Sequence, residues 1–69
     1  MDEFKISLKA ARHNANLTQE ELAKKLRVNR TTVNNWETGK STPDFSTLNM
    51  ISKICGVPLD FIFLPNKST

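Results

Sequence analysis

The stretch QEELAKKLRVNRTTVNNWET, residues 19–38, decides the fold of this chain. Within each half, its apolar residues recur at intervals of three or four, which is the spacing of helices that bury one face. The apolar positions are Leu22, Ala23, Leu26, Val28, Val33 and Trp36. The second half leaves one arginine and several uncharged polar side chains for solvent: Arg30, Thr31, Asn34, Asn35 and Thr38. The stretch therefore predicts two short helices, the second with few charges on its outer face.

Capping residues predict where these two helices begin and end. Thr18 followed by Glu21 fits a capping box, which predicts a helix over residues 19–26. Asn29 is a suitable N-cap for a helix over residues 30–38, and a glycine follows as its stop. The break between them is too short for side-by-side antiparallel packing. The two helices therefore predict a helix-turn-helix unit.

One helix is predicted before this unit and two after it. The first has apolar residues at helical spacing and ends at Asn16, which tolerates a left-handed backbone. Its apolar positions are Phe4, Leu8, Ala11 and Ala15. The fourth helix is capped by Asp44 and ends at Gly56. Its inward positions are Leu48, Ile51, Ile54 and Cys55.

A short fifth helix is predicted near the C-terminal end, because Pro58 suits a first helical turn. It contains Leu59, Ile62 and Phe63. No segment alternates apolar and polar residues, so no strand is expected. We therefore expect one compact all-α domain of five helices over residues 1–69. Its core spans about 4–63, its helix-turn-helix spans about 19–38, and residues 65–69 are expected to be flexible.

Composition limits the class of protein. Sixty-nine residues make one small domain whose single core is only marginally sufficient. Ten Lys and Arg against seven Asp and Glu give a net charge of +3, which is compatible with a polyanionic partner. The single Cys55 excludes an internal disulfide and favours a reducing compartment. No signal-peptide pattern opens the chain, and the longest apolar run, residues 61–64, is too short for a bilayer. We expect a cytoplasmic protein with no membrane partner.

The outer face of the helix over residues 30–38 suits the edges of base pairs in a DNA major groove. Arg can contact guanine through two hydrogen bonds, Asn can pair with adenine, and the Thr methyl can touch the thymine methyl. The alternative is an ordinary solvated face. Such faces usually favour Glu, Lys and Gln, which form helices better than Thr and Asn do. The pattern therefore favours double-stranded DNA as the partner.

Several motifs resemble the lambda-repressor-like family of phage repressors, Cro proteins and related bacterial regulators, also called the XRE family. They are LTQEELA at 17–23, WETGK at 36–40, Pro43, Leu48 and Gly56-Val57. The resemblance covers roughly residues 4–63. It implies a lambda-repressor-like DNA-binding domain that controls transcription, usually as a homodimer on a palindromic operator. We expect a repressor of phage or bacterial type.

The resemblance also implies site residues. The positions that read bases are Arg30, Thr31 and Asn35, flanked by Thr32 and Asn34. The positions that contact phosphate are Gln19, Thr38, Lys40 and the backbone near Phe45, and Gln19 also braces the recognition helix. Arg27 stands where the family usually has Gly, and it is either a further phosphate contact or a solvated turn residue. Arg12 and Glu37 match a partly buried salt bridge, and the helical wheel independently places Glu37 towards the core.

The apolar C-terminal residues cannot all face so small a core, and they predict a dimer interface: Leu59, Phe61, Phe63 and Leu64. Self-pairing there would place two recognition helices about 34 Å apart. The alternative is that these residues seal the end of the domain. A different class of function is a protein-interaction module, of antitoxin or antirepressor type, whose C-terminal end captures a regulatory protein partner.

Other chemistry has no supporting motif. His13 is a lone histidine on a polar face, and no Cys/His cluster fits a metal. No glycine-rich loop and no nucleophile–base pair can be proposed. We expect no enzymatic activity, no cofactor, no metal and no small-molecule substrate.

Overall fold

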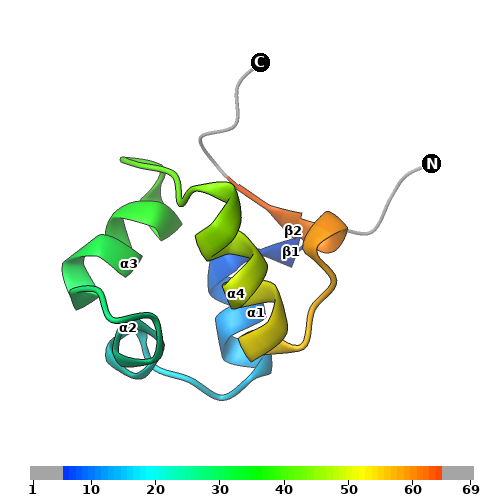
Figure 1. Cartoon of the computed structure of the whole chain (residues 1–69), viewed down its shortest axis with the longest axis horizontal. Coiled ribbons are helices and arrows are strands. Elements are labelled where there is room, and N and C mark those ends of the chain that lie inside the picture. Colours follow the sequence, from blue (N-terminus) through cyan, green and yellow to red (C-terminus); the bar gives the residue numbers. More distant parts are fainter. Residues whose placement is uncertain (1–5, 65–69) are drawn as a thin grey trace.

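Four α-helices, one 3-10 turn and two very short strands make up the described part of the computed structural model, residues 6–64 without the Phe63 side chain. In chain order they are β1 (Ile6–Ser7), α1 (Leu8–Asn14), α2 (Gln19–Leu26), α3 (Arg30–Thr38), α4 (Phe45–Cys55), η1 (Leu59–Phe61) and β2 (Ile62–Phe63). Figure 1 shows α2 and α3 on one side of α1 and α4, and the strands on the other.

The predicted ranges of α2 and α3 are confirmed. Thr18 Oγ1 accepts a hydrogen bond of 3.0 Å from the Glu21 N–H, and Glu21 Oε1 accepts one of 2.9 Å from the Thr18 N–H. This reciprocal pair is the expected capping box. Asn29 is the N-cap of α3, but its side chain makes no capping hydrogen bond. Gly39, with φ of 86°, ends α3 as expected.

The first helix is shorter than predicted. It begins at Leu8, because Ser7 is its N-cap and the Ser7 hydroxyl accepts a hydrogen bond from the Ala10 N–H. Ile6 and Ser7 are extended and pair with another segment instead of continuing the helix. Phe4, which the apolar spacing assigned to this helix, lies outside the described residues.

The fourth helix follows the prediction, with Asp44 as its N-cap and Gly56 after its last residue. Asp44 Oδ1 accepts a hydrogen bond of 2.8 Å from the Thr47 N–H. Ile51 and Cys55 are buried in the core, while Leu48 and Ile54 are only partly buried against it. The inward face of α4 is therefore the predicted one.

The expected fifth helix is absent from the described residues, and the expectation of no strand was wrong. After Pro58 the chain makes a single 3-10 turn, and Ile62 then has extended backbone, with φ of −94° and ψ of 123°. Ile62 pairs with Ile6 and Phe63 with Ser7 in a parallel ribbon. Two-residue strands are too short to show an alternating pattern, and their pairing partner lies at the other end of the sequence.

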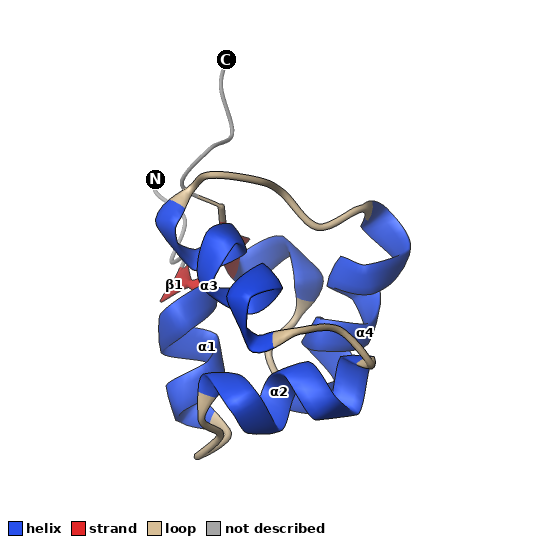
Figure 2. Cartoon of the chain, turned by 90° about the vertical axis from the view of Figure 1, so that its left-hand side faces the viewer, coloured by secondary structure: helices blue, strands red, loops and turns tan. Residues whose placement is uncertain are grey.

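The core lies where the four helices meet. Its largest fully buried side chains are Leu8, Leu22, Val33 and Ile51, which come one each from α1, α2, α3 and α4. Ala23 is only 3 % exposed in α2, the helix that packs most closely with α3. A small residue here permits the close approach of the two helices, which Figure 2 shows crossing steeply.

Two non-glycine residues have left-handed backbone. Asn16 has φ of 59° and Arg27 has φ of 61°. Arg27 ends α2, and its N–H bonds to the Lys24 carbonyl at 3.2 Å. Asn tolerates this region well, whereas Arg does not. The turn between α2 and α3 therefore carries backbone strain at Arg27.

Arg27→Gly is expected to raise the free energy of unfolding by about 1 kcal/mol, because glycine adopts positive φ without a clash of its side chain. Urea denaturation measures the change. Asn16→Gly is the control and should give a smaller gain. A lower unfolding midpoint for Arg27→Gly would contradict the strain at this turn.

Candidate nucleic-acid interface

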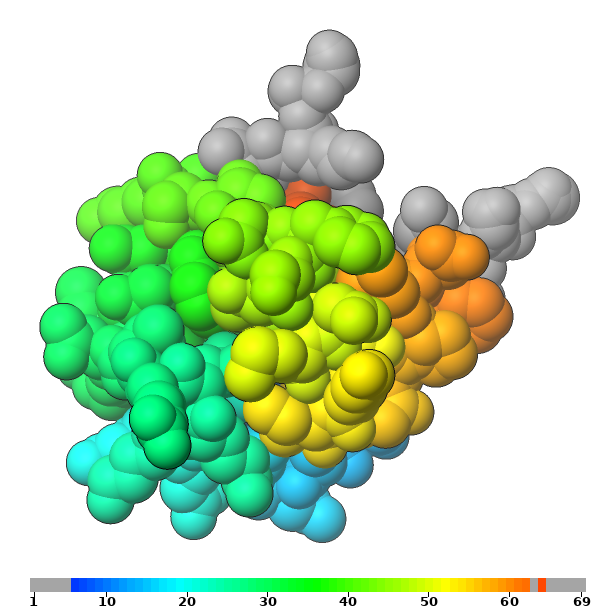
Figure 3. Space-filling view, viewed as in Figure 1, coloured from blue at the N-terminus to red at the C-terminus, as the bar shows by residue number. Residues whose placement is uncertain are grey.

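Helix α3 lies at the surface with one face buried and the other open. Val33 and Trp36 are buried in the core. On the other side, Arg30 and Thr31 are exposed, whereas Thr32, Asn34 and Asn35 are half-buried. Figure 3 shows the green surface of α3 along the left margin of the molecule. The candidate base-reading residues therefore share an accessible face.

Three residues of this face keep their polar groups unoccupied. Within residues 6–64, the side chains of Thr31, Thr32 and Asn35 form no hydrogen bond. Their hydroxyl and amide groups remain available for donors and acceptors of a partner. This is the arrangement that direct readout of base edges requires.

The other polar residues of α3 are held by Gln19, the first residue of α2. Gln19 Oε1 accepts a hydrogen bond of 3.1 Å from Arg30 Nη1. Gln19 Nε2 donates to Asn34 Oδ1 at 3.2 Å and to Glu37 Oε1 at 2.9 Å. The resemblance predicted that Gln19 braces the recognition helix, but no sequence spacing indicated these three particular partners.

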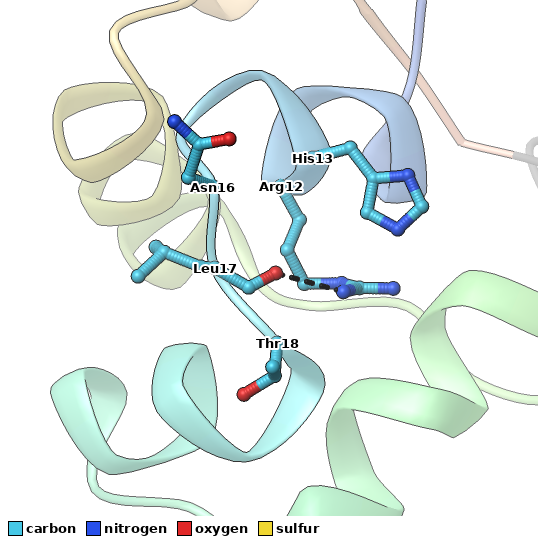
Figure 4. Close-up of a pocket in the computed structure, with 5 residues that line it drawn as sticks. All are labelled: Arg12, His13, Asn16, Leu17 and Thr18. Atoms are coloured by element: carbon cyan, nitrogen blue, oxygen red, sulfur yellow. Dashed lines mark hydrogen bonds between the residues drawn. The ribbon is translucent and has the colours of Figure 1, made fainter.

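A buried ion pair joins α1 to α3. Arg12 Nε lies 2.7 Å from Glu37 Oε2, and Arg12 Nη2 donates to Glu37 Oε1 at 3.2 Å. The two side chains are 7 % and 3 % exposed. Arg12 Nη1 also donates to the Leu17 carbonyl at 2.9 Å, the dashed line in Figure 4. The pair therefore fixes α1, the turn before α2, and α3 relative to one another.

An open pocket lies beside this pair at the turn between α1 and α2 (Figure 4). It is lined by Arg12, His13, Asn16, Leu17 and Thr18. The Arg12 guanidinium is already bonded to Glu37 and Leu17, and His13 is exposed. Every buried side-chain polar atom in the described residues has a partner. The pocket therefore offers no unsatisfied group to a ligand.

The candidate phosphate contacts surround α3 at the surface. Arg27, Thr38 and Lys40 are all exposed. The Thr38 hydroxyl donates to the Asn34 carbonyl at 3.0 Å, so it must leave that bond in order to donate to a phosphate. Arg27 and Lys40 form no ion pair within the described residues, so both charges remain available.

The start of α4 is less suited to an anion. The Asp44 carboxylate already accepts the Thr47 N–H, and these hydrogen bonds lower the pKa of Asp44 below its ordinary value. Its negative charge opposes a phosphate near the Phe45 backbone. The Phe45 side chain is 72 % exposed, an exposure that the sequence did not indicate.

The predicted dimer residues lie in η1 and around β2, and not on a helix. Phe61 is 43 % exposed, while Leu59 and Leu64 are half-buried. The side chain of Phe63 lies outside the described part of the structure. Figure 1 places this segment on the opposite side of α1 and α4 from α3.

The described residues contain no cluster of three or more His, Cys, Asp or Glu side chains that could hold a metal ion. The lone Cys55 is buried, and burial raises the pKa of its thiol. None of the described helices has the length and apolar character needed to cross a membrane.

Comparisons with known proteins agree with this geometry. Residues 8–62 match a family model described as Helix-turn-helix, and the chain therefore belongs to this XRE-type family of DNA-binding proteins. The family consists of transcriptional regulators and not of enzymes, which confirms the expectation that the chain is not an enzyme.

Three relatives illustrate the match. The chain is 45% identical over 58 residues to the HTH-type transcriptional activator BcrR of Enterococcus faecalis, and 39% identical over 59 residues to the HTH-type transcriptional regulator YqaE of Bacillus subtilis. These regions take in 84% and 86% of this chain but only 28% and 51% of those proteins. An HTH-type transcriptional regulator of Methanocaldococcus jannaschii is 45% identical over 61 residues, which is 88% of this chain and 92% of that protein. No solved structure matches the chain.

Arg12→Ala or Glu37→Ala is expected to lower the free energy of unfolding by about 3–5 kcal/mol, because each leaves the other charge buried without its partner. Urea denaturation measures the loss. Lys9→Ala, at an exposed position of α1, is the control and should change stability by less than about 0.5 kcal/mol. Unchanged midpoints for both variants would rule out a structural role for the pair.

Proposed function

We propose that this chain binds double-stranded DNA sequence-specifically through α3 and regulates transcription as a repressor on a palindromic operator. The observation that carries the proposal is the accessible face of α3, where Thr31, Thr32 and Asn35 keep their polar groups unoccupied. A helix of this kind in the major groove reads base edges directly. Membership in the helix-turn-helix family supports the same ligand.

The roles on α3 follow from the chemistry of each side chain. Arg30, at the N-terminal end that meets the bases in helix-turn-helix docking, contacts guanine. Asn35 pairs with adenine, and Thr31 places its methyl group against thymine. Thr32 and Asn34 flank these contacts and reach bases or backbone.

The phosphate contacts position the domain on the duplex and carry no sequence information themselves. Lys40 and Arg27 supply positive charge on either side of α3, and Thr38 supplies a hydroxyl. The strain at Arg27 is consistent with this role, because a charged side chain stands where a glycine would relax the backbone. The Phe45 N–H is a weaker candidate, since the Asp44 carboxylate lies beside it.

The repressor is expected to act as a homodimer through Leu59, Phe61, Phe63 and Leu64. Phe61 exposes apolar surface at the end of a domain whose core is small. A two-fold pair of such surfaces buries that area and presents two recognition helices to one operator. The pairing surface would be the 3-10 turn and β2, in place of the fifth helix expected from the sequence.

Selection of bound sequences from a random duplex pool tests ligand and symmetry together. We expect two inverted half-sites whose centres lie about 10 base pairs apart. Recovery of a single half-site would contradict the homodimer while leaving DNA recognition intact. No enrichment at low ionic strength would contradict DNA recognition itself.

Arg30→Ala is expected to weaken binding to the selected duplex by about 1–3 kcal/mol and to relax base preference at one position of each half-site. Fluorescence anisotropy titrations against the selected duplex and a shuffled duplex measure both effects. Lys40→Ala is the matched control, since loss of a phosphate contact should weaken both duplexes alike and reduce the salt dependence. Equal losses on the two duplexes for Arg30→Ala would remove its base-reading role.

A further inference from the structure

The amide of Gln19 has no hydrogen left for a ligand. A glutamine side chain carries two N–H donors on Nε2 and a carbonyl oxygen that only accepts. One donor goes to Asn34 Oδ1 at 3.2 Å and the other to Glu37 Oε1 at 2.9 Å. The carbonyl Oε1 accepts Arg30 Nη1 at 3.1 Å. All three bonds lie within the protein.

The orientation of this amide is set by Glu37. A carboxylate can only accept, so the NH₂ group of Gln19 must face it, and a reversed amide would bring two oxygens together. Glu37 is itself held by the Arg12 guanidinium at 2.7 Å and is almost fully buried. The buried ion pair therefore determines that Gln19 presents its oxygen towards Arg30.

This geometry conflicts with a phosphate contact by Gln19. Phosphate oxygens at neutral pH accept hydrogen bonds, so Gln19 would have to give up Asn34 or Glu37 in order to donate to one. Giving up Glu37 would remove one hydrogen bond from a carboxylate buried in the protein. The phosphate role that the family resemblance implies is therefore unfavourable in this chain.

The geometry points to a different role: Gln19 is a positioning residue that holds the Arg30 guanidinium ready for a base, and it is not a phosphate contact. This inference rests on the proposed DNA-binding function. Arg30 is exposed and long, so an unheld side chain would lose much rotamer freedom on binding. The bond to Gln19 uses one of five N–H donors, which leaves enough for a two-bond contact with guanine.

A double-mutant cycle between Gln19→Met and Arg30→Ala tests the inference. Methionine keeps the length of glutamine without its amide, and thermal melting first checks that the variant folds. We expect Gln19→Met to weaken the selected duplex about tenfold and to leave a shuffled duplex unchanged. In the Arg30→Ala background, the same change should have no further effect. Lys40→Ala in that background is the control and should add its full loss.

Equal losses on both duplexes, additive with Arg30→Ala, would overturn the inference and restore a phosphate contact. A measurement on the free protein separates it from the proposed function. Side-chain ¹⁵N relaxation of Arg30 Nε should show faster motion in Gln19→Met than in the unaltered protein. Unchanged motion would also overturn the inference. Failure of the unaltered protein to bind any duplex would instead reject the proposed function, and the relaxation result would still decide whether Gln19 restrains Arg30. If Gln19→Met does not fold, Gln19→Leu serves for the same measurements.

Discussion

The hydrogen-bonded ion pair between Arg12 and Glu37 is the constraint on which the arrangement of the helices depends. Both charges are removed from water, so each must find its full set of partners inside the protein. Arg12 satisfies this requirement with the Glu37 carboxylate and the Leu17 carbonyl, and Glu37 accepts in addition from Gln19. These contacts come from three successive segments of the chain. The angle at which α3 is presented therefore follows from electrostatics as well as from packing of the core.

The apolar core and this polar network have complementary effects. The four fully buried apolar side chains bring one residue from each helix to a common centre, and their contacts are not directional. Hydrogen bonds are directional and allow little rotation of α3 about its own axis. Together they hold one face of α3 towards Val33 and Trp36 and the opposite face outward. A readout surface with few charges is thereby kept in place by a charged contact behind it.

The sequence predicted those features that depend on local chemistry. The limits of α2 and α3 follow from Thr18, Glu21 and Gly39, which act within one helical turn, and these limits were right. The C-terminal segment was wrong because its conformation depends on Ile6, more than fifty positions earlier in the sequence. The contact between Gln19 and Arg30 spans two crossing helices, so it required the angle between them. Residue types on α3 indicated a ligand class, but only the coordinates separated held side chains from unoccupied ones.

The parallel pairing of β1 with β2 has a consequence for the way this domain can be joined to other protein. Ile6 and Ile62 are neighbours in the ribbon, so the chain enters and leaves the folded unit at a common site. Figure 1 places that site away from α3. A tag, linker or additional module fused at either terminus would thus begin on the side remote from the groove-binding helix. The ribbon makes the domain a self-contained cassette, which fits its occurrence within relatives several times its length.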